Sequence, residues 1–198
     1  GTEDNRVRKL DYSIQISKLF YERFIKNADI TLFSPNHVPG LYEAFGMPEF
    51  DSLYLKYEKD KSIPKQTIGA QELFQALLKE RAETGRIYIM NLDHCNTHSS
   101  FKDKVYMSNL CQEITLPTTP VQHIDDKEGE IALCILSAIN LGLLTDMNEL
   151  EELCDLSVRA LDEIIDYQEY PVEAAKISAQ SRRSLGIGYI GLAHYLAK

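Results

Sequence analysis

Residues 67–91 read TIGAQELFQALLKERAETGRIYIMN, and this stretch indicates the class of fold. Its apolar side chains follow the spacing of one helix face, which predicts a helix from about Thr67 to Glu83. They are Ala70, Leu73, Phe74, Leu77 and Leu78. Gly85 stands where many helices end, and the run from Arg86 to Asn91 predicts a buried strand. A helix followed directly by a strand is typical of α/β proteins.

The same elements recur along the chain. Further strands are predicted at Leu10–Ile16 and Glu130–Ser137, and further helices at Lys18–Lys26, Val38–Phe45, Phe50–Tyr57, from Asp146 and after Pro171. Strands that alternate with helices favour βα units in a largely parallel sheet or barrel. Because no linker or repeat interrupts the sequence, we expect residues 1–198 to be a single fragment of one domain.

The strand predicted at Glu130–Ser137 has two unlike faces. Side chains alternate between the faces of a strand, which puts Ile131, Leu133 and Ile135 on one side. Cys134 lies on the other side. In a barrel of parallel strands the uniformly bulky face should pack against outer helices, so we expect Cys134 to point inward.

Composition limits the possible functions. A formal net charge of −9 gives no basic surface for nucleic acid, and no apolar run is long enough to cross a membrane. The cysteines at 95, 111, 134 and 154 have irregular spacing, which is typical of reduced thiols in a cytoplasmic protein. The sequence starts without Met and ends inside a helical pattern, so we expect a piece of a longer protein.

A connection without periodicity, from about Leu92 to Gly129, contains the candidate site. Connections of this length in compact domains are usually functional or disordered. Within it, Asn109, Cys111 and Glu113 occupy every second position. In an extended or irregular segment such side chains can converge, whereas in a helix residues two apart do not face each other.

The residues around Cys111 favour one kind of chemistry. Asn109 offers a hydrogen-bonding amide and Glu113 a possible general base. A nucleophilic cysteine needs a nearby base or cation to form thiolate, and a carboxylate disfavours the thiolate. Hydrogen-atom chemistry by the neutral thiol therefore fits Cys111 better than protease-like catalysis, although most lone cysteines are only small buried apolar residues.

The sequence resembles a known family, the large subunit of class I ribonucleotide reductase. The resemblance rests on the stretches Asn109–Glu113 and Glu130–Cys134, and also on Asp29–Pro35, Thr84–Ile89, Asp93–His98 and Arg182–Gly188. It covers essentially all 198 residues and is closest to the aerobic, bacterial and phage type.

The resemblance implies a fold and a reaction. The fold would be part of a ten-stranded α/β barrel with a central finger loop at about residues 92–129, and Cys111 at its tip. Cys111 would become a thiyl radical that abstracts the 3′ hydrogen of the ribose. Glu113 would take the 3′-hydroxyl proton and Asn109 would hold the sugar hydroxyls, so that all three bind substrate. Cys134 matches one of two cysteines that supply the reducing electrons.

The same resemblance implies partners. They are a ribonucleoside diphosphate substrate, a small metal-containing subunit that supplies the radical, thioredoxin or glutaredoxin as reductant, and a second copy in a homodimer. ATP and deoxynucleotide effectors act on the full-length family. The segments for effectors, substrate phosphates and radical transfer lie outside these 198 residues, so the fragment should bind no cofactor and be inactive alone.

Several other interpretations remain open. Gly186–Gly191 has the form GxGxxG, which would allow a nucleotide- or dinucleotide-binding module, but a clear preceding strand is missing. The chain could also be a non-catalytic assembly fragment. His94, Cys95 and His98 have a spacing that could bind zinc, but no fourth ligand is apparent, and a hydrogen-bonded loop is the favoured interpretation. Cys154 is expected in the core, on the apolar face of its helix.

Overall fold

The computed structural model describes residue 7 and residues 9–198. The chain divides into two compact units, one ending at Leu116 and the other running from Pro117 to Lys198. Within the described residues, no helix is long and apolar enough to span a membrane.

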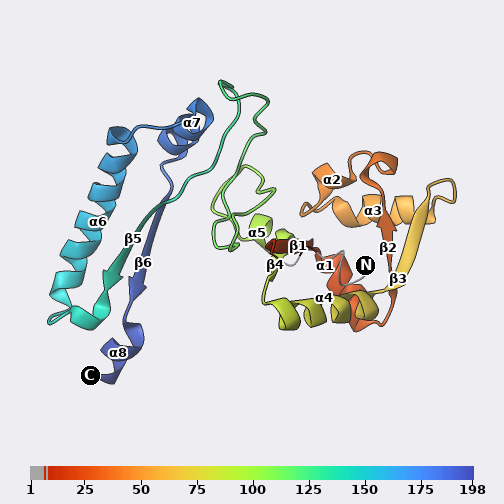
Figure 1. The fold of residues 1–198 in the computed structure, drawn as a ribbon, viewed down its shortest axis with the longest axis horizontal. Coiled ribbons are helices and arrows are strands. Elements are labelled where there is room, and N and C mark those ends of the chain that lie inside the picture. Colours follow the sequence, from red (N-terminus) through yellow and green to blue (C-terminus); the bar gives the residue numbers. More distant parts are fainter. Residues whose placement is uncertain (1–6, 8) are drawn as a thin grey trace. The chain divides into compact units, whose positions relative to one another are not determined.

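The first unit alternates strands and helices (Figure 1). Its elements are β1 (Tyr12–Ile16), α1 (Lys18–Ile25), β2 (Asp29–Phe33), the short 3-10 helix η2 (Pro35–His37), α2 (Leu41–Ala44), α3 (Phe50–Lys59), β3 (Lys65–Gly69), α4 (Ala70–Thr84), β4 (Ile87–Asn91) and α5 (Leu92–Thr97). β1 and β4 are parallel, with Ile14 opposite Ile89, as the order strand–helix–strand requires. β2 and β3 are antiparallel, with Thr31 opposite Thr67.

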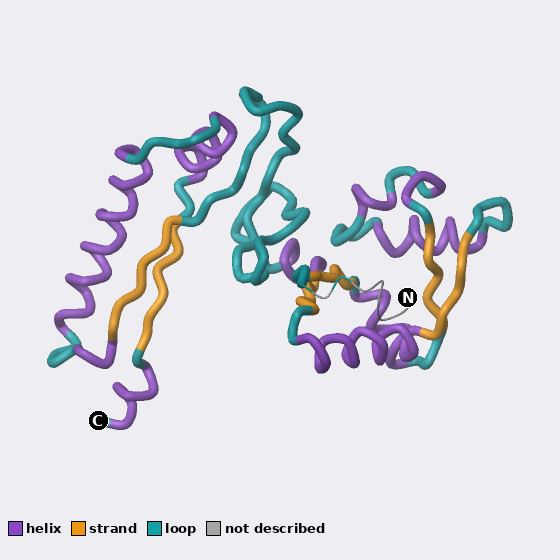
Figure 2. The backbone as a smooth tube through the Cα atoms, viewed as in Figure 1, coloured by secondary structure: helices purple, strands orange, loops and turns teal. Residues whose placement is uncertain are grey.

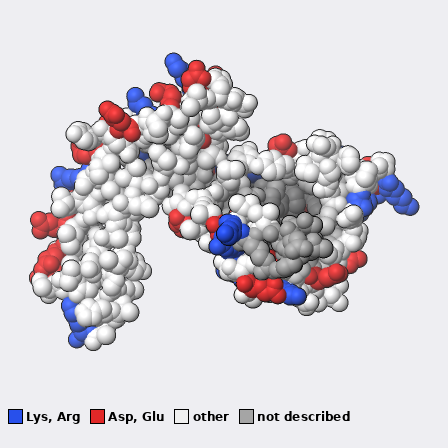
Figure 3. Space-filling view, viewed as in Figure 1, with Lys and Arg blue, Asp and Glu red and all other residues white. Residues whose placement is uncertain are grey.

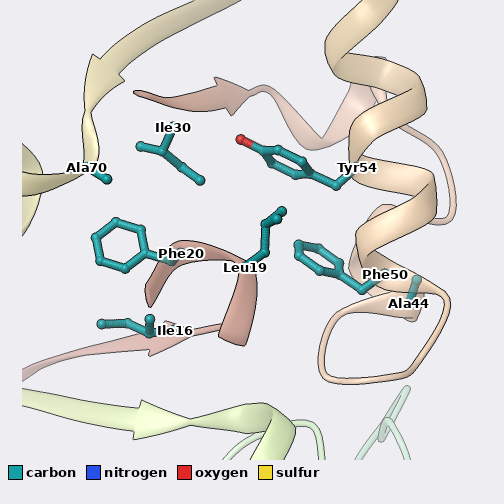
Figure 4. Close-up of a cluster of buried hydrophobic side chains, with 8 residues drawn as sticks. All are labelled: Ile16, Leu19, Phe20, Ile30, Ala44, Phe50, Tyr54 and Ala70. Atoms are coloured by element: carbon teal, nitrogen blue, oxygen red, sulfur yellow. The ribbon is translucent and has the colours of Figure 1, made fainter. Parts of the chain in front are cut away.

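An aromatic core holds this unit together. The side chain of Leu19 from α1 points toward those of Phe50 and Tyr54 from α3, whereas the Phe20 ring points the other way, toward Ala70 (Figure 4). The Phe20 and Phe74 rings lie 6.0 Å apart between centroids and connect α1 to α4. Burial of such side chains stabilises the unit by about 1.5–3 kcal/mol for each large apolar residue.

The second unit is built on one parallel strand pair. Its elements are β5 (Ile135–Asn140), the 3-10 helix η3 (Leu141–Leu143), α6 (Asn148–Tyr167), α7 (Glu173–Arg182), β6 (Leu185–Ile190) and α8 (Leu192–Ala197). Ser137 of β5 lies opposite Ile187 of β6. Figure 1 shows the long helix α6 running beside these strands. Ile139 is buried, whereas Leu136 on the other face is 64% exposed, which indicates that only one face of the pair is covered.

The predicted α/β class is confirmed, with parallel pairs among the strands. The described strands form three separate two-stranded sheets, ordered β1-β4, β2-β3 and β5-β6. A closed barrel needs every strand to have a neighbour on both sides, so these residues do not close a barrel by themselves. Charged side chains of both signs are spread over the face drawn in Figure 3, rather than gathered into one basic patch.

Three predicted boundaries were wrong, each because the backbone bonds elsewhere. Residues 67–69 belong to β3 rather than to the helix, since they pair with β2. The predicted strand Glu130–Ser137 begins only at Ile135, because Glu130 bonds Thr119 and the Ile131 amide donates to Ala174 O at 3.1 Å. The start of the expected loop is the six-residue helix α5, too short to give a clear period. Figure 2 shows the loop that follows it.

The prediction that Cys154 lies in the core was also wrong, since its side chain is exposed. Cys154 occupies the first half of α6. The buried residues of this helix, Leu161 and Ile165, both lie in the second half. The predicted apolar face of the helix is therefore buried near Leu161, but it is not buried at Cys154.

Candidate active site

Cys111 lies at the corner of a tight turn. The Gln112 amide donates to the carbonyl of Asn109 at 3.2 Å, which closes a four-residue turn. Gln112 has φ 66°, an uncommon conformation for a residue other than glycine. The turn carries the Cys111 side chain into an exposed position. The thiol is therefore presented outward rather than buried as an apolar side chain.

The side chains of Asn109 and Glu113 meet across this turn. Asn109 Nδ2 donates to Glu113 Oε1 at 2.5 Å, and Asn109 Oδ1 accepts the Ile114 amide at 3.1 Å. Ser108 Oγ closes the same ring by donating to Ile114 O at 2.6 Å. The predicted convergence of the amide and the carboxylate is thus present. It comes from a turn in an irregular segment, and not from alternation along an extended one.

Tyr88 is the neighbour of Cys111 that sequence reasoning missed. It projects from β4, is half-buried and lies close enough to Cys111 for the two groups to interact electrostatically. Its pKa is raised above the ordinary value, first because negative charge on Cys111 would oppose phenolate formation and then because of burial. A hydroxyl in an otherwise apolar strand was the only signal, and the partner lies 23 positions further along the sequence.

Buried contacts fix the base of the loop that carries this turn. Asn96 of α5 accepts the Val105 amide at 2.8 Å and donates to Val105 O at 3.0 Å. Gln15 of β1 donates to Tyr106 O at 2.7 Å. Val105 is fully buried. The segment that leads to Cys111 is therefore held by two side chains of the folded framework, while the turn itself is held by its own polar groups.

Cys134 belongs to the second unit, where it directly precedes β5 and is half-buried. Ile135 donates its amide to Ser184 O at 3.3 Å, which continues the strand pairing up to the residue next to Cys134. Cys134 and Leu136 are two positions apart in extended chain, where such side chains point to the same face. Cys134 therefore shares the exposed face of Leu136. The alternation predicted from the sequence therefore holds for Cys134 and Leu136, although the strand starts later, and the inward orientation of Cys134 in a barrel stays a prediction.

The glycine motif does not form a dinucleotide-binding turn. Such a turn lies between a strand and a helix, with glycines that let phosphate approach the helix N-terminus. Here Gly186 and Gly188 are inside β6. Only Gly191, with φ 73°, lies at the start of a helix, and α8 has six residues.

The three candidate zinc ligands, His94, Cys95 and His98, have different surroundings. The rings of His94 and His98 lie 5.4 Å apart in an edge-to-face arrangement. Cys95 packs against the apolar cluster of Met90, Leu92 and Val105, and burial raises the pKa of its thiol. Among the described residues, no three His, Cys, Asp or Glu side chains gather as a metal site would require.

Comparison with known proteins gives consistent matches. The sequence model of the family described as ribonucleotide reductase, barrel domain, matches residues 1–198. Ribonucleoside-diphosphate reductase subunit alpha of Buchnera aphidicola (subsp. Schizaphis graminum) is 59% identical, and ribonucleoside-diphosphate reductase 1 subunit alpha of Escherichia coli K12 is also 59% identical. The subunit alpha of Enterobacteria phage T4 is 43% identical. Each alignment covers 100% of this chain but 27% of the relative, so the chain spans about a quarter of their length.

Proposed function

Because this chain belongs to the ribonucleotide reductase barrel-domain family, we propose that it is the central catalytic segment of a ribonucleoside-diphosphate reductase large subunit. Its reaction is the reduction of ribonucleoside diphosphates to deoxyribonucleotides. The printed names of the relatives support the reaction, and their greater length supports the assignment of a segment. The observation that carries the chemistry is the turn that joins Asn109 to Glu113 around an exposed Cys111.

Cys111 begins the reaction as a thiyl radical. Its sulfur abstracts the hydrogen from C3′ of the ribose, so that an S–H bond forms and a C–H bond breaks. The radical itself is supplied to the chain by a separate, metal-containing small subunit.

Glu113 and Asn109 handle the sugar hydroxyls. Glu113 accepts the 3′-hydroxyl proton, while the Asn109 amide holds the hydroxyls in register. In the substrate-free turn these two side chains bond each other. A sugar hydroxyl that enters between them can therefore replace a hydrogen bond already aimed at the site, so that little reorganisation is needed.

Cys134 supplies reducing equivalents. Together with a second thiol from the longer protein, it is oxidised to a disulfide as water is lost from C2′ of the ribose. Two thiols thereby provide the two electrons and two protons that convert the ribonucleotide to the deoxyribonucleotide and water. Thioredoxin or glutaredoxin restores the pair.

The full-length protein would complete the fold around these residues. The parallel pairs β1-β4 and β5-β6 are parts of a ten-stranded α/β barrel, with residues 92–129 as its finger loop. Unpaired strand edges in each described pair support completion by further chain. A homodimer regulated by ATP and deoxynucleotides is part of the proposal, and a cytoplasmic location stays a prediction from the cysteines.

An assay of the full-length protein tests the function. With its small subunit, thioredoxin and ribonucleoside diphosphates, it should form deoxyribonucleotides, and the Cys134→Ser variant should lose thioredoxin-dependent multiple turnover. The isolated 198-residue chain should form none. If the full-length protein binds nucleotides but reduces none, the proposed reductase function is wrong. A nucleotide-binding module would then be the better interpretation.

A further inference from the structure

Gly186 lies directly beside the Cys134 thiol. In the parallel pair, Gly186 of β6 is opposite Leu136 of β5. Cys134 precedes Leu136 by two positions in extended chain, so both side chains lean toward the face above Gly186. This explains how a residue just before β5 can lie over the beginning of the strand pair.

No side chain fits at Gly186 while these neighbours stay in place. A Cβ built on Gly186 would lie 2.7 Å from Cys134 Sγ, and it would be closer still to Leu136 Cδ2. Carbon atoms in contact normally stay about 3.5–4.0 Å apart. Gly186 has no positive φ, so its backbone does not require glycine. Gly186 therefore lacks a side chain for reasons of space, and the Cys134 thiol and the Leu136 side chain share that space.

Gly188 provides an internal comparison. It lies two positions further along β6, opposite Ala138 and on the same face of the strand. The nearest atom to a Cβ at Gly188 is Ser137 O at 4.0 Å, which is ordinary contact. An alanine therefore fits at Gly188 but not at Gly186. Both replacements change strand propensity alike, and only one affects the thiol.

An open cavity lies beside Gly186 on the exposed face of the strand pair. Leu136, Ala138, Gly186 and Gly188 line part of an open cavity of about 610 Å³ on the two strands. Cys134 Sγ lies next to Gly186, which is one of the residues that line this cavity. The two glycines keep the cavity floor at backbone level.

We propose that Gly186 is a positioning residue for the Cys134 thiol. Because Gly186 has no side chain, the thiol can lie over the β5–β6 pair in the position from which it acts. The positioning follows from the contacts above, whereas its effect on turnover rests on the proposed function of Cys134 as a reductant. The groups that meet at this point are the Cys134 sulfur and the Leu136 side chain, over the backbone of Gly186. Added volume should therefore displace the sulfur before it disturbs the fold, because a cysteine side chain rotates freely compared with a paired strand.

The test compares Gly186→Ala with Gly188→Ala in the full-length reductase with its small subunit. A misplacement of about 1 Å can cost roughly 10²-fold in rate, so kcat should fall by about that factor in Gly186→Ala, with KM unchanged. The rate at which iodoacetamide alkylates Cys134, followed by mass spectrometry, should change in the same variant. Gly188→Ala should match wild type in both measurements, and alkylation of Cys154 serves as the internal reference. Equal behaviour of the two glycine variants would overturn the proposal.

A double variant separates the two crowded neighbours. Leu136→Ala in the Gly186→Ala background removes the contact with Leu136 but leaves the one with Cys134. Continued low kcat and altered Cys134 alkylation support the proposal, whereas recovery of both would assign the effect to Leu136 and overturn it. Nucleotide binding and the unfolding midpoint check that each variant is folded. If Cys134→Ser keeps full turnover, the reductant role fails, while the alkylation comparison still decides the positioning.

Discussion

Cys111 and Cys134 are supported in opposite ways. Cys111 lies on an exposed turn held by hydrogen bonds among Ser108, Asn109 and Glu113. Cys134 lies beside a strand pair, where the absence of a side chain at Gly186 makes room for its sulfur. The first arrangement is sensitive to the loss of a polar atom, and the second to the gain of a carbon atom. A cysteine in a loop is thus placed by local polar chemistry, and one beside a sheet by register and volume.

Among substitutions of the polar groups around Cys111, the largest effect is expected from Glu113→Gln, which tests the polar side of this comparison. The amide keeps the size of the side chain and can still bond Asn109, but it cannot accept the substrate proton. General-base catalysis contributes about 10²–10⁴-fold, so deoxynucleotide formation should fall by that range while nucleotide binding is retained. Glu128→Gln is the control, since Glu128 is another exposed loop carboxylate. Wild-type turnover in Glu113→Gln would rule out Glu113 as the base.

Glu58→Gln tests whether turnover depends only on the polar groups near Cys111 or on polar groups throughout the first unit. Glu58 pairs with Arg23 at 2.5 Å and accepts a bond from Thr31, in a largely enclosed position away from the turn. Loss of these charge-assisted bonds should lower the free energy of unfolding by about 1.5–3 kcal/mol at pH 7. Turnover at low temperature, where the variant is folded, should remain at the wild-type level.

The stability that Glu58 contributes should also depend on pH. The Arg23 hydrogen bond, followed by that of Thr31, lowers the folded-state pKa of Glu58 below its usual value. The carboxylate therefore stabilises the fold above its unfolded pKa of about 4.3, and this contribution is lost as pH falls through the depressed folded pKa. Urea unfolding from pH 7 downward should show the wild-type advantage over Glu58→Gln shrinking in that acidic range. A constant difference throughout would contradict the assignment.

The smallest effect is expected from Ser108→Ala. The variant loses the bond to Ile114 O but leaves Asn109 paired with Glu113. A neutral hydrogen bond contributes about 0.5–1.5 kcal/mol, so turnover should fall only several-fold. Ser52→Ala removes a similar bond to a backbone carbonyl, at 2.8 Å from Glu49 O, and should not affect turnover. Equal losses in both serine variants would show that the turn is not specially sensitive to its polar atoms.

Local features of the fold could be predicted from the sequence. The α4 helix and the β4 strand follow from apolar spacing and a glycine stop, both of which are read within a few residues. The residue types at 109, 111 and 113 likewise pointed to a site. In contrast, residues 67–69 joined β3 and the strand containing Ile135 began late, because pairing with distant segments decides such boundaries.

The contacts that place the two thiols could not be predicted in the same way. Tyr88 meets Cys111 only because β4 and the turn come together in space. The role of Gly186 needs the register that puts it opposite Leu136 and beside Cys134. Sequence spacing alone suggested a nucleotide-binding glycine motif there. The structure instead gives the first glycine a packing task that depends on a residue 52 positions earlier.

The measurement that tests the central claim most directly is deoxynucleotide formation by the full-length reductase carrying Cys111→Ser. Serine keeps the size of the side chain, but its O–H bond is much stronger than S–H, which should stop hydrogen-atom transfer. Cys154→Ser is the matched control, because Cys154 is also exposed. We expect Cys111→Ser to form no detectable deoxynucleotide while it still binds nucleotide, and Cys154→Ser to behave as wild type. Turnover that survives in Cys111→Ser would contradict the radical role of Cys111.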